Sequence, residues 1–219
     1  GAGKSTTVKI MCGLLEDFEG KVDVLGYDVR ENDIEVKKRI GYIPENAVMY
    51  EHLTPMEYLE FIGTMYGLER KEVARKADEL LSLFEMRENK DERMVNFSKG
   101  MKQKVHIISG LLHNPEVIFM DEPLNGLDAN AVIIVKEVIA RLAKEGKKVL
   151  LIDADPQGDL TTYLGYFDGD NLDVTLADLM QKVIRDEPMT AGEGILHQRE
   201  GVDLVPSNLE LSALEMSLV

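Results

Sequence analysis

The first residues of the chain have the types and the spacing of a phosphate-binding turn. Residues 1–7 read Gly-Ala-Gly-Lys-Ser-Thr-Thr, the end of a G-x-x-x-x-G-K-[ST] loop whose first glycine would precede Gly1. In such a loop backbone N–H groups surround phosphates, the lysine meets the terminal phosphates and the next hydroxyl binds Mg²⁺. An ordinary glycine turn before a helix would use the same residues, so this motif alone leaves both interpretations open. The candidate ligands here are Gly1, Gly3, Lys4, Ser5 and Thr6, with Ser5 also a candidate metal ligand.

A pair of carboxylates provides the second piece of candidate chemistry. The apolar run Val117-Ile-Phe-Met120 is followed directly by Asp121 and Glu122. An acid at the end of a buried strand can complete a Mg²⁺ shell together with Ser5, and Glu122 is placed to orient or deprotonate an attacking water. Taken alone, the pair could also be a strand end that caps a turn.

Hydrophobic periodicity indicates which elements would position these groups. Helical and strand-like segments alternate along most of the chain, and a helical block at about residues 50–113 interrupts the alternation. The pattern predicts an α/β fold with an open, mostly parallel sheet and an inserted helical block. A first helix follows the glycine turn. The predicted strands are residues 21–25, 39–43, 117–120, 148–152 and 202–205, and the other predicted helices are residues 56–66, 70–84, 98–112, 131–144, 175–185 and 209–218.

Charge narrows the classes of function. The 219 residues carry a formal charge of −15, which argues against a nucleic-acid footprint spread over the surface. Residues 148–219 hold 14 acidic and 4 basic residues, a net of −10, whereas residues 1–147 hold 26 and 21, a net of −5. Either two segments of different character or one domain with an acidic tail would give these counts.

The setting of the protein is indicated by its single cysteine and by the length of its apolar runs. Cys12 cannot form an internal disulfide, and we expect it in the core. With no signal peptide at the start, this indicates a reducing, cytoplasmic setting. No stretch approaches the ~20 uncharged apolar residues of a membrane-spanning helix, so a membrane role would go through a partner. The chain begins at Gly1 rather than a methionine, from which we expect a fragment.

A third motif lies between the phosphate-binding turn and the pair of carboxylates. Residues 96–104, Asn-Phe-Ser-Lys-Gly-Met-Lys-Gln-Lys, resemble the signature segment of ABC-transporter ATPases, whose usual form is Leu-Ser-Gly-Gly-Gln. The opening turn, residues 40–46 at the Gln-loop position, residues 112–123 and the D-loop residues 124–128 follow the same family's order. The resemblance covers residues 1 to about 147. It implies a P-loop NTPase-like domain that binds ATP and Mg²⁺, with its N-terminal strand missing because that strand would lie before Gly1.

The resemblance also implies roles and partners. In that family two subunits share each site, so Ser98 and Gly100 would contact the γ-phosphate held by the partner subunit of a homodimer or an ABC-type heterodimer. Glu45 stands at the Gln-loop position and Asp128 in the D-loop. The further partners would be transmembrane permease subunits, which would place the chain at the cytoplasmic face of a membrane. The departures from the usual signature and Gln-loop are Lys99, Met101 and Glu45.

The pattern changes near residue 147. The ABC pattern would continue into a switch histidine, but residues 153–157 read Asp-Ala-Asp-Pro-Gln. Residues 147–162 and 202–211 resemble the ParA/MinD-type partition ATPases, in which such an aspartate, Asp153 here, would lie near the metal and the attacking water. That family's own glycine-rich loop is absent before this segment. We expect an unpaired Asp153 carboxylate facing the nucleotide; the alternative is a strand-end Asp-Pro turn.

The sequence therefore predicts two parts. Residues 1–147 would be an ABC-type ATPase domain with its helical subdomain at about 50–113, and residues 148–219 a ParA/MinD-like α/β fragment. The predicted function is the ATP-binding and hydrolysing subunit of an ABC-type membrane transporter, with Glu122 catalytic and Asp121 a metal ligand. A ParA-type positioning ATPase and a non-functional fusion of two ATPase fragments stay open. Because the strand before the phosphate turn would be missing, we expect weak ATP binding.

Overall fold

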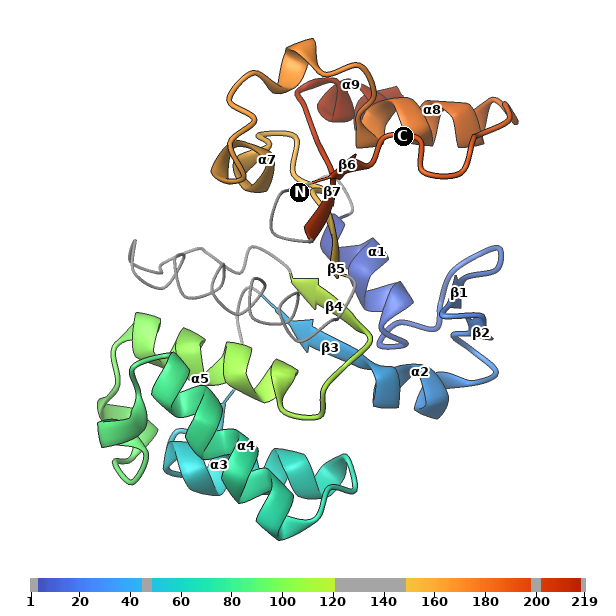
Figure 1. Ribbon diagram of the computed structural model, residues 1–219. Coiled ribbons are helices and arrows are strands. Elements are labelled where there is room, and N and C mark those ends of the chain that lie inside the picture. Colours follow the sequence, from blue (N-terminus) through green and yellow to red (C-terminus); the bar gives the residue numbers. More distant parts are fainter. Residues whose placement is uncertain (1–3, 45–48, 121–148, 198–201, 218–219) are drawn as a thin grey trace. The chain divides into compact units, whose positions relative to one another are not determined.

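The computed structural model describes residues 4–44, 49–120, 149–197 and 202–217. The chain divides into two compact units, one of residues 3–134 and one of residues 135–219. Figure 1 labels their helices and strands. The predicted seam near residue 147 and the predicted helix at 131–144 lie outside the described residues.

In chain order, the described residues of each unit form short helices and strands. The first unit contains α1 Lys4–Met11, β1 Asp23–Val24, β2 Tyr27–Asp28, α2 Asp33–Arg39, β3 Ile40–Ile43, α3 Pro55–Met65, α4 Arg70–Leu83, η1 Arg87–Asn89, η2 Met94–Asn96, α5 Lys99–Leu111 and β4 Val117–Met120. The second contains β5 Val149–Ile152, α7 Asp159–Tyr163, η3 Gly169–Asn171, α8 Leu176–Ile184, β6 Leu196–His197, β7 Val202–Val205 and α9 Glu210–Ser217.

A parallel strand pair lies at the centre of the first unit. β3 and β4 run in the same direction with Ile40 opposite Val117 and Ile43 opposite Met120, which confirms both predicted strands and their parallel direction. Helix α5 packs against β3 at two glycines. A Cβ atom added to Gly41 would lie 2.4 Å from the carbonyl oxygen of Gly110, so the two backbones approach more closely than any other residue would permit.

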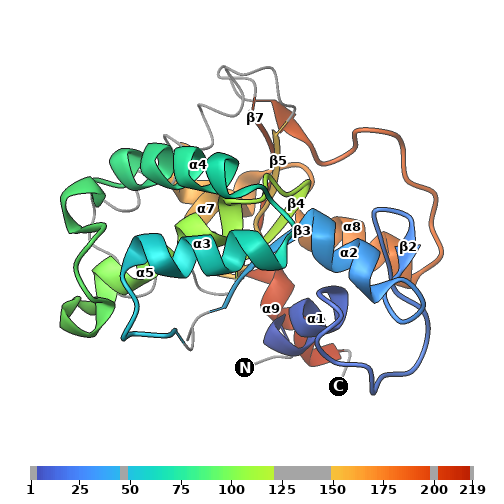
Figure 2. The same ribbon diagram turned by 90° about the horizontal axis from the view of Figure 1, so that it is seen from below.

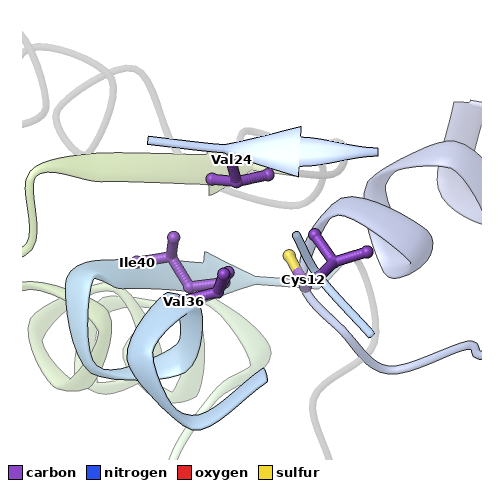
Figure 3. Packing of buried hydrophobic residues seen from close by; sticks show 5 residues of the cluster. Cys12, Val24, Val36 and Ile40 are labelled. Atoms are coloured by element: carbon purple, nitrogen blue, oxygen red, sulfur yellow. The ribbon is translucent and has the colours of Figure 1, made fainter. Parts of the chain in front are cut away.

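A small core joins α1 and α2 to this pair. Figure 3 shows the side chains of Cys12, Val24, Val36 and Ile40 converging on one another. Cys12 is 1% exposed, as predicted, and burial raises the pKa of its thiol to about 12. The predicted strand over residues 21–25 is shorter in the structure. Leu25 and Gly26 have φ of 54° and 81°, and this left-handed turn ends β1 and begins the antiparallel strand β2.

The predicted helical block consists of α3, α4 and α5, which lie side by side (Figures 1 and 2). Thr54 begins α3 with a reciprocal capping box: its hydroxyl accepts from the backbone N–H of Glu57, whose carboxylate accepts from the N–H of Thr54. Gly63 of α3 faces Val73 of α4, and a Cβ atom on Gly63 would lie 2.4 Å from a valine methyl. The helices therefore pack more closely than a side chain at residue 63 would permit.

The second unit is built on a three-stranded sheet in the order β5-β7-β6. β5 and β7 are parallel, with Val149 opposite Val202, and β6 is antiparallel to β7. Ala177 of α8 packs against Leu211 and Leu214 of α9. Both predicted strands and both predicted helices are present here. α7 and β6 were not predicted, because five and two residues are too short to show a period.

None of the helices in the described ranges is long and apolar enough to cross a membrane. No group of three His, Cys, Asp or Glu side chains in those ranges could hold a metal ion.

His106 of α5 is half-buried, but both of its ring nitrogens are shielded from solvent, and this generates a pH prediction. Neither ring nitrogen has a hydrogen-bond partner among the described residues, and burial lowers the pKa of His106 to about 4. The unfolded chain, whose histidine has a pKa near the usual ~6.5, therefore binds a proton that the folded chain does not bind between these two values. We expect this group to remove about 2 kcal/mol of stability between pH 7.5 and pH 5.

The measurement is urea unfolding of the wild type and of His106→Leu across this pH range. The variant should lose less stability on acidification than the wild type. His52→Leu is the matched control, because His52 is exposed in a turn of the same unit. Equal pH slopes for the wild type and His106→Leu would contradict the prediction.

Candidate nucleotide-binding site

The lysine and the hydroxyls of the phosphate-binding turn lie on the first turn of α1. Lys4 is half-buried and begins the helix, and Ser5 and Thr6 follow it with exposed side chains. The first turn carries no acidic residue. Since the first N–H groups of a helix lack internal partners and carry partial positive charge, this end is suited to an anion. Gly1 and Gly3 lie outside the described residues.

The signature segment forms the N-terminus of a second helix. Ser98 is the N-cap of α5, with φ −62° and ψ 161°, and its hydroxyl accepts a 3.2 Å hydrogen bond from the backbone N–H of Met101. Ser98 and Lys99 are exposed, Gly100 is half-buried, and no acidic residue lies in this first turn. Ser98 therefore caps this helix, and the serine and the glycine lie at a helix end of partial positive charge.

Three carboxylate residues follow the parallel strand pair, one after β3 and two after β4. Asp121 and Glu122 come directly after Met120, the last residue of β4, and Glu45 comes two residues after Ile43, the last residue of β3. Ile43 and Met120 are opposite one another. Glu45, Asp121, Glu122 and Asp128 themselves lie outside the described residues, so their roles remain predictions.

Asp153 has a different environment from the predicted one. It follows β5 and is 3% exposed. One carboxylate oxygen accepts from the N–H of Asp155 at 3.1 Å, and the other accepts from the N–H and the hydroxyl of Thr161 at 2.8 and 2.7 Å. The expected unpaired carboxylate is therefore wrong, because Asp155 donates from two residues away and the chain folds back at Gly158 so that Thr161 supplies two more donors. This geometry favours the strand-end turn.

A buried polar network extends from Asp153 to the next strand. The hydroxyl of Thr161 also accepts a 3.1 Å bond from the N–H of Ser207, just after β7. Both residues are 1% exposed. This role of Thr161 was not predicted, because its only signal in the sequence is a hydroxyl residue eight positions after the aspartate.

A shallow hollow lies elsewhere in the first unit. It has a volume of about 410 Å³ and lies between α3 and α4, where Phe61, Thr64, Arg70 and Val73 are among its lining residues. None of the candidate nucleotide ligands lines it. We therefore assign it no part in nucleotide binding.

Comparisons with known proteins agree with the motif order. The family model described as ABC transporter matches residues 1–125, and a second model, described as AAA domain, matches residues 129–219. The chain is 39% identical over 151 residues to the ABC transporter ATP-binding protein NatA of Bacillus subtilis, covering 68% of this chain and 61% of that protein. It is 35% identical over 150 residues to the linearmycin resistance ATP-binding protein LnrL of the same organism, with 68% and 48% covered.

A solved structure is similar to this chain in fold. The structure described as an ATP binding subunit of an ABC transporter is 38% identical, with a TM-score of 0.58 over 63% of this chain and 57% of that one. This similarity confirms the predicted α/β fold of the P-loop NTPase type. The chain spans 61%, 53% and 42% of the length of three of the curated relatives it matches. Because the family model covers residues 1–125, more than half of the 219, the chain belongs to the ABC transporter family.

Proposed function

We propose that this chain provides the ATP-binding and hydrolysing unit of an ABC-type membrane transporter and couples ATP-driven dimer closure to a permease. One observation carries the proposal. Both motifs that would contact phosphate, at Lys4 and at Ser98, stand at helix N-termini whose first turns contain no acidic residue. This is notable in a chain of net charge −15, and it leaves both helix ends suitable for an anion.

The nucleotide would be held by the start of α1. Lys4 would contact the terminal phosphates, and the backbone N–H groups from Gly1 to Thr6 would surround them. The oxygen donors of Ser5 and Asp121 fit the preference of Mg²⁺ for hydroxyl and carboxylate ligands. When bound, that ion would neutralise phosphate charge that develops during hydrolysis.

Hydrolysis would depend on the carboxylate after the metal ligand. Glu122 would orient the attacking water and accept its proton. Glu45 and Asp128, at the Gln-loop and D-loop positions, would line the same site. The aligned ends of β3 and β4 at Ile43 and Met120 support this assignment, because the segments that carry Glu45 and Glu122 both start from that edge.

A second subunit would complete each site. Ser98 and Gly100 would contact the γ-phosphate bound to the partner subunit, so that ATP joins two subunits in a homodimer or an ABC-type heterodimer. The cap hydrogen bond from Met101 fixes the first turn of α5 and orients its N–H groups. Such contacts would be lost after hydrolysis, which would open the dimer.

Exposed apolar side chains on α3 and just before it support a permease partner. Tyr50, Phe61 and Met65 are 63%, 43% and 71% exposed, and the rings of Tyr50 and Phe61 contact edge to face at 5.6 Å between centroids. Clusters of this kind are characteristic of protein interfaces. A permease would place this unit at the cytoplasmic side of a membrane.

The match of residues 129–219 to an AAA domain favours a second candidate function. In the ParA-type interpretation these residues would belong to a positioning ATPase, and Asp153 would act on the nucleotide. The three donors around Asp153 support a structural role for this carboxylate instead.

Removal of the lysine tests nucleotide binding. Lys4→Ala should weaken Mg²⁺-ATP binding at least ~10-fold, because a charge-assisted contact to phosphate contributes about 1.5–3 kcal/mol. Calorimetry with the full chain measures the affinity. Lys9→Ala is the control, since Lys9 is an exposed lysine on the last turn of the same helix. The same loss in both variants would contradict a specific role for Lys4.

Removal of the carboxylate tests hydrolysis. Glu122→Gln should lower ATP turnover by ~10²–10⁴-fold, because the amide cannot accept the proton of the attacking water. Nucleotide affinity should stay within a few-fold of the wild type, and ATP should trap a dimer. Phosphate release and sedimentation give these two readouts. Full turnover in Glu122→Gln would rule out this mechanism.

Asp153→Asn separates the two candidate functions. The substitution places an amide among three donors, and we expect it to cost the second unit about 1–3 kcal/mol, measured by the hydrogen exchange of the β5 and β7 amides. Turnover per folded molecule should stay within two-fold of the wild type. A large loss of turnover with unchanged exchange would favour the ParA-type role.

A further inference from the structure

The segment that follows the Gln-loop position is attached to the signature helix by an ion pair. The ammonium of Lys102, on α5, lies 2.8 Å from a carboxylate oxygen of Glu51. Lys102 is 25% and Glu51 43% exposed in their side chains. Glu51 lies six residues after Glu45 and Lys102 four residues after Ser98, so the pair connects two segments of the proposed catalytic site.

A backbone contact runs beside this ion pair. The N–H of Met94, just before the signature, donates a 3.0 Å hydrogen bond to the carbonyl of Leu53. Met94 is fully buried, and Phe97 is 6% exposed. The turn that leads into α5 is therefore anchored to residues 49–54, while Ser98 and Lys99 at the tip of the helix stay exposed.

The other end of α5 is fixed independently. Gly110 lies against the backbone of Gly41, and the ring nitrogen Nε2 of His113 forms a 2.8 Å hydrogen bond with the carbonyl oxygen of Ile40. The C-terminal half of α5 is therefore held on β3. Its N-terminal half projects from that anchor, and a small rotation there would move Ser98 and Gly100.

The charges near the N-terminus of α5 explain why the ion pair is favourable. Lys99 and Lys102 place two cations near the N-terminus of α5, where the helix dipole disfavours positive charge. Glu51 supplies the carboxylate that the first turn of α5 lacks. The pair therefore offsets the unfavourable interaction between Lys102 and the helix dipole. It also holds this side of α5 against residues 49–54.

We propose that the Glu51–Lys102 ion pair is a positioning contact that holds the signature helix in the orientation needed to reach the partner subunit's nucleotide. This inference rests on the proposed function. Lys102 acts through Glu51 and does not itself contact the phosphates. The pair also gives a direct connection between the segment after Glu45 and the helix that closes on the partner.

The test measures ATP-dependent dimerisation in the Glu122→Gln background, in which the dimer is trapped. Glu51→Gln and Lys102→Met should each raise the dimer dissociation constant. A partly exposed pair contributes ~0.2–1 kcal/mol and a homodimer has two copies, so we expect a rise of about two- to thirty-fold. The double variant should be no weaker than either single variant, because both changes remove the same interaction. Lys102→Arg should retain most of the wild-type affinity.

Two controls separate positioning from general stability. Glu79→Gln removes an ion pair of similar length with Arg75, 2.8 Å on the surface of α4, and should leave dimerisation unchanged. The melting temperature and the nucleotide affinity of each monomer should also match those of the parent. A fall in melting temperature that accounts for the weaker dimer would overturn the positioning role.

The remaining outcomes distinguish the inference from the function on which it rests. If the parent dimerises with ATP and Glu51→Gln dimerises equally well, the inference fails and the proposed function stands. If Lys102→Met weakens the dimer equally in the Glu51→Gln background, Lys102 acts on the partner directly and the inference is overturned. If the parent forms no dimer with ATP, the proposed function fails, and the inference fails with it.

Discussion

The backbone of α5 at Gly110 lies so close to β3 that residue 41 could not carry a side chain there. The remaining geometry of the first unit depends on this contact. It fixes the signature helix relative to the strand that leads toward Glu45, and through the register of β3 with β4 it also fixes the helix relative to the strand that leads toward Asp121. This one backbone contact therefore fixes where the signature helix and the segments that follow β3 and β4 begin.

Electrostatics explains how an acidic chain can carry two anion-binding helix ends. The net charge of −15 would repel a nucleotide if it were spread evenly. Instead, the first turns of α1 and α5 contain no acidic residue of their own, and α5 carries Lys99 and Lys102. The acidic excess is concentrated in residues 148–219, outside the segment that matches the ABC transporter model. Local composition therefore decides binding here, and total charge does not.

Sequence periodicity predicted the elements whose apolar residues recur at a regular spacing. α3, α4, α5 and β3 fall at their predicted positions, and motif order predicted the family. The bonds from Thr161 to Asp153 were not predicted, because Thr161 is eight residues away and reaches the carboxylate only after the turn at Gly158. The contact between Glu51 and Lys102 likewise joins residues far apart in sequence. Neither has a periodic signal, because tertiary packing alone brings the partners together.

The burial of Cys12 has a practical consequence for spectroscopy. A thiol that is 1% exposed and whose pKa is raised to about 12 holds almost no thiolate at neutral pH, and the thiolate is the form that reacts with maleimides and disulfide reagents. Cys12 of the folded first unit should therefore react very little with the reagents used for site-directed labelling. A cysteine introduced on an exposed helix could carry a fluorophore or a spin label without removal of the native one, and delayed reaction of Cys12 would report the opening of the core formed by α1 and α2.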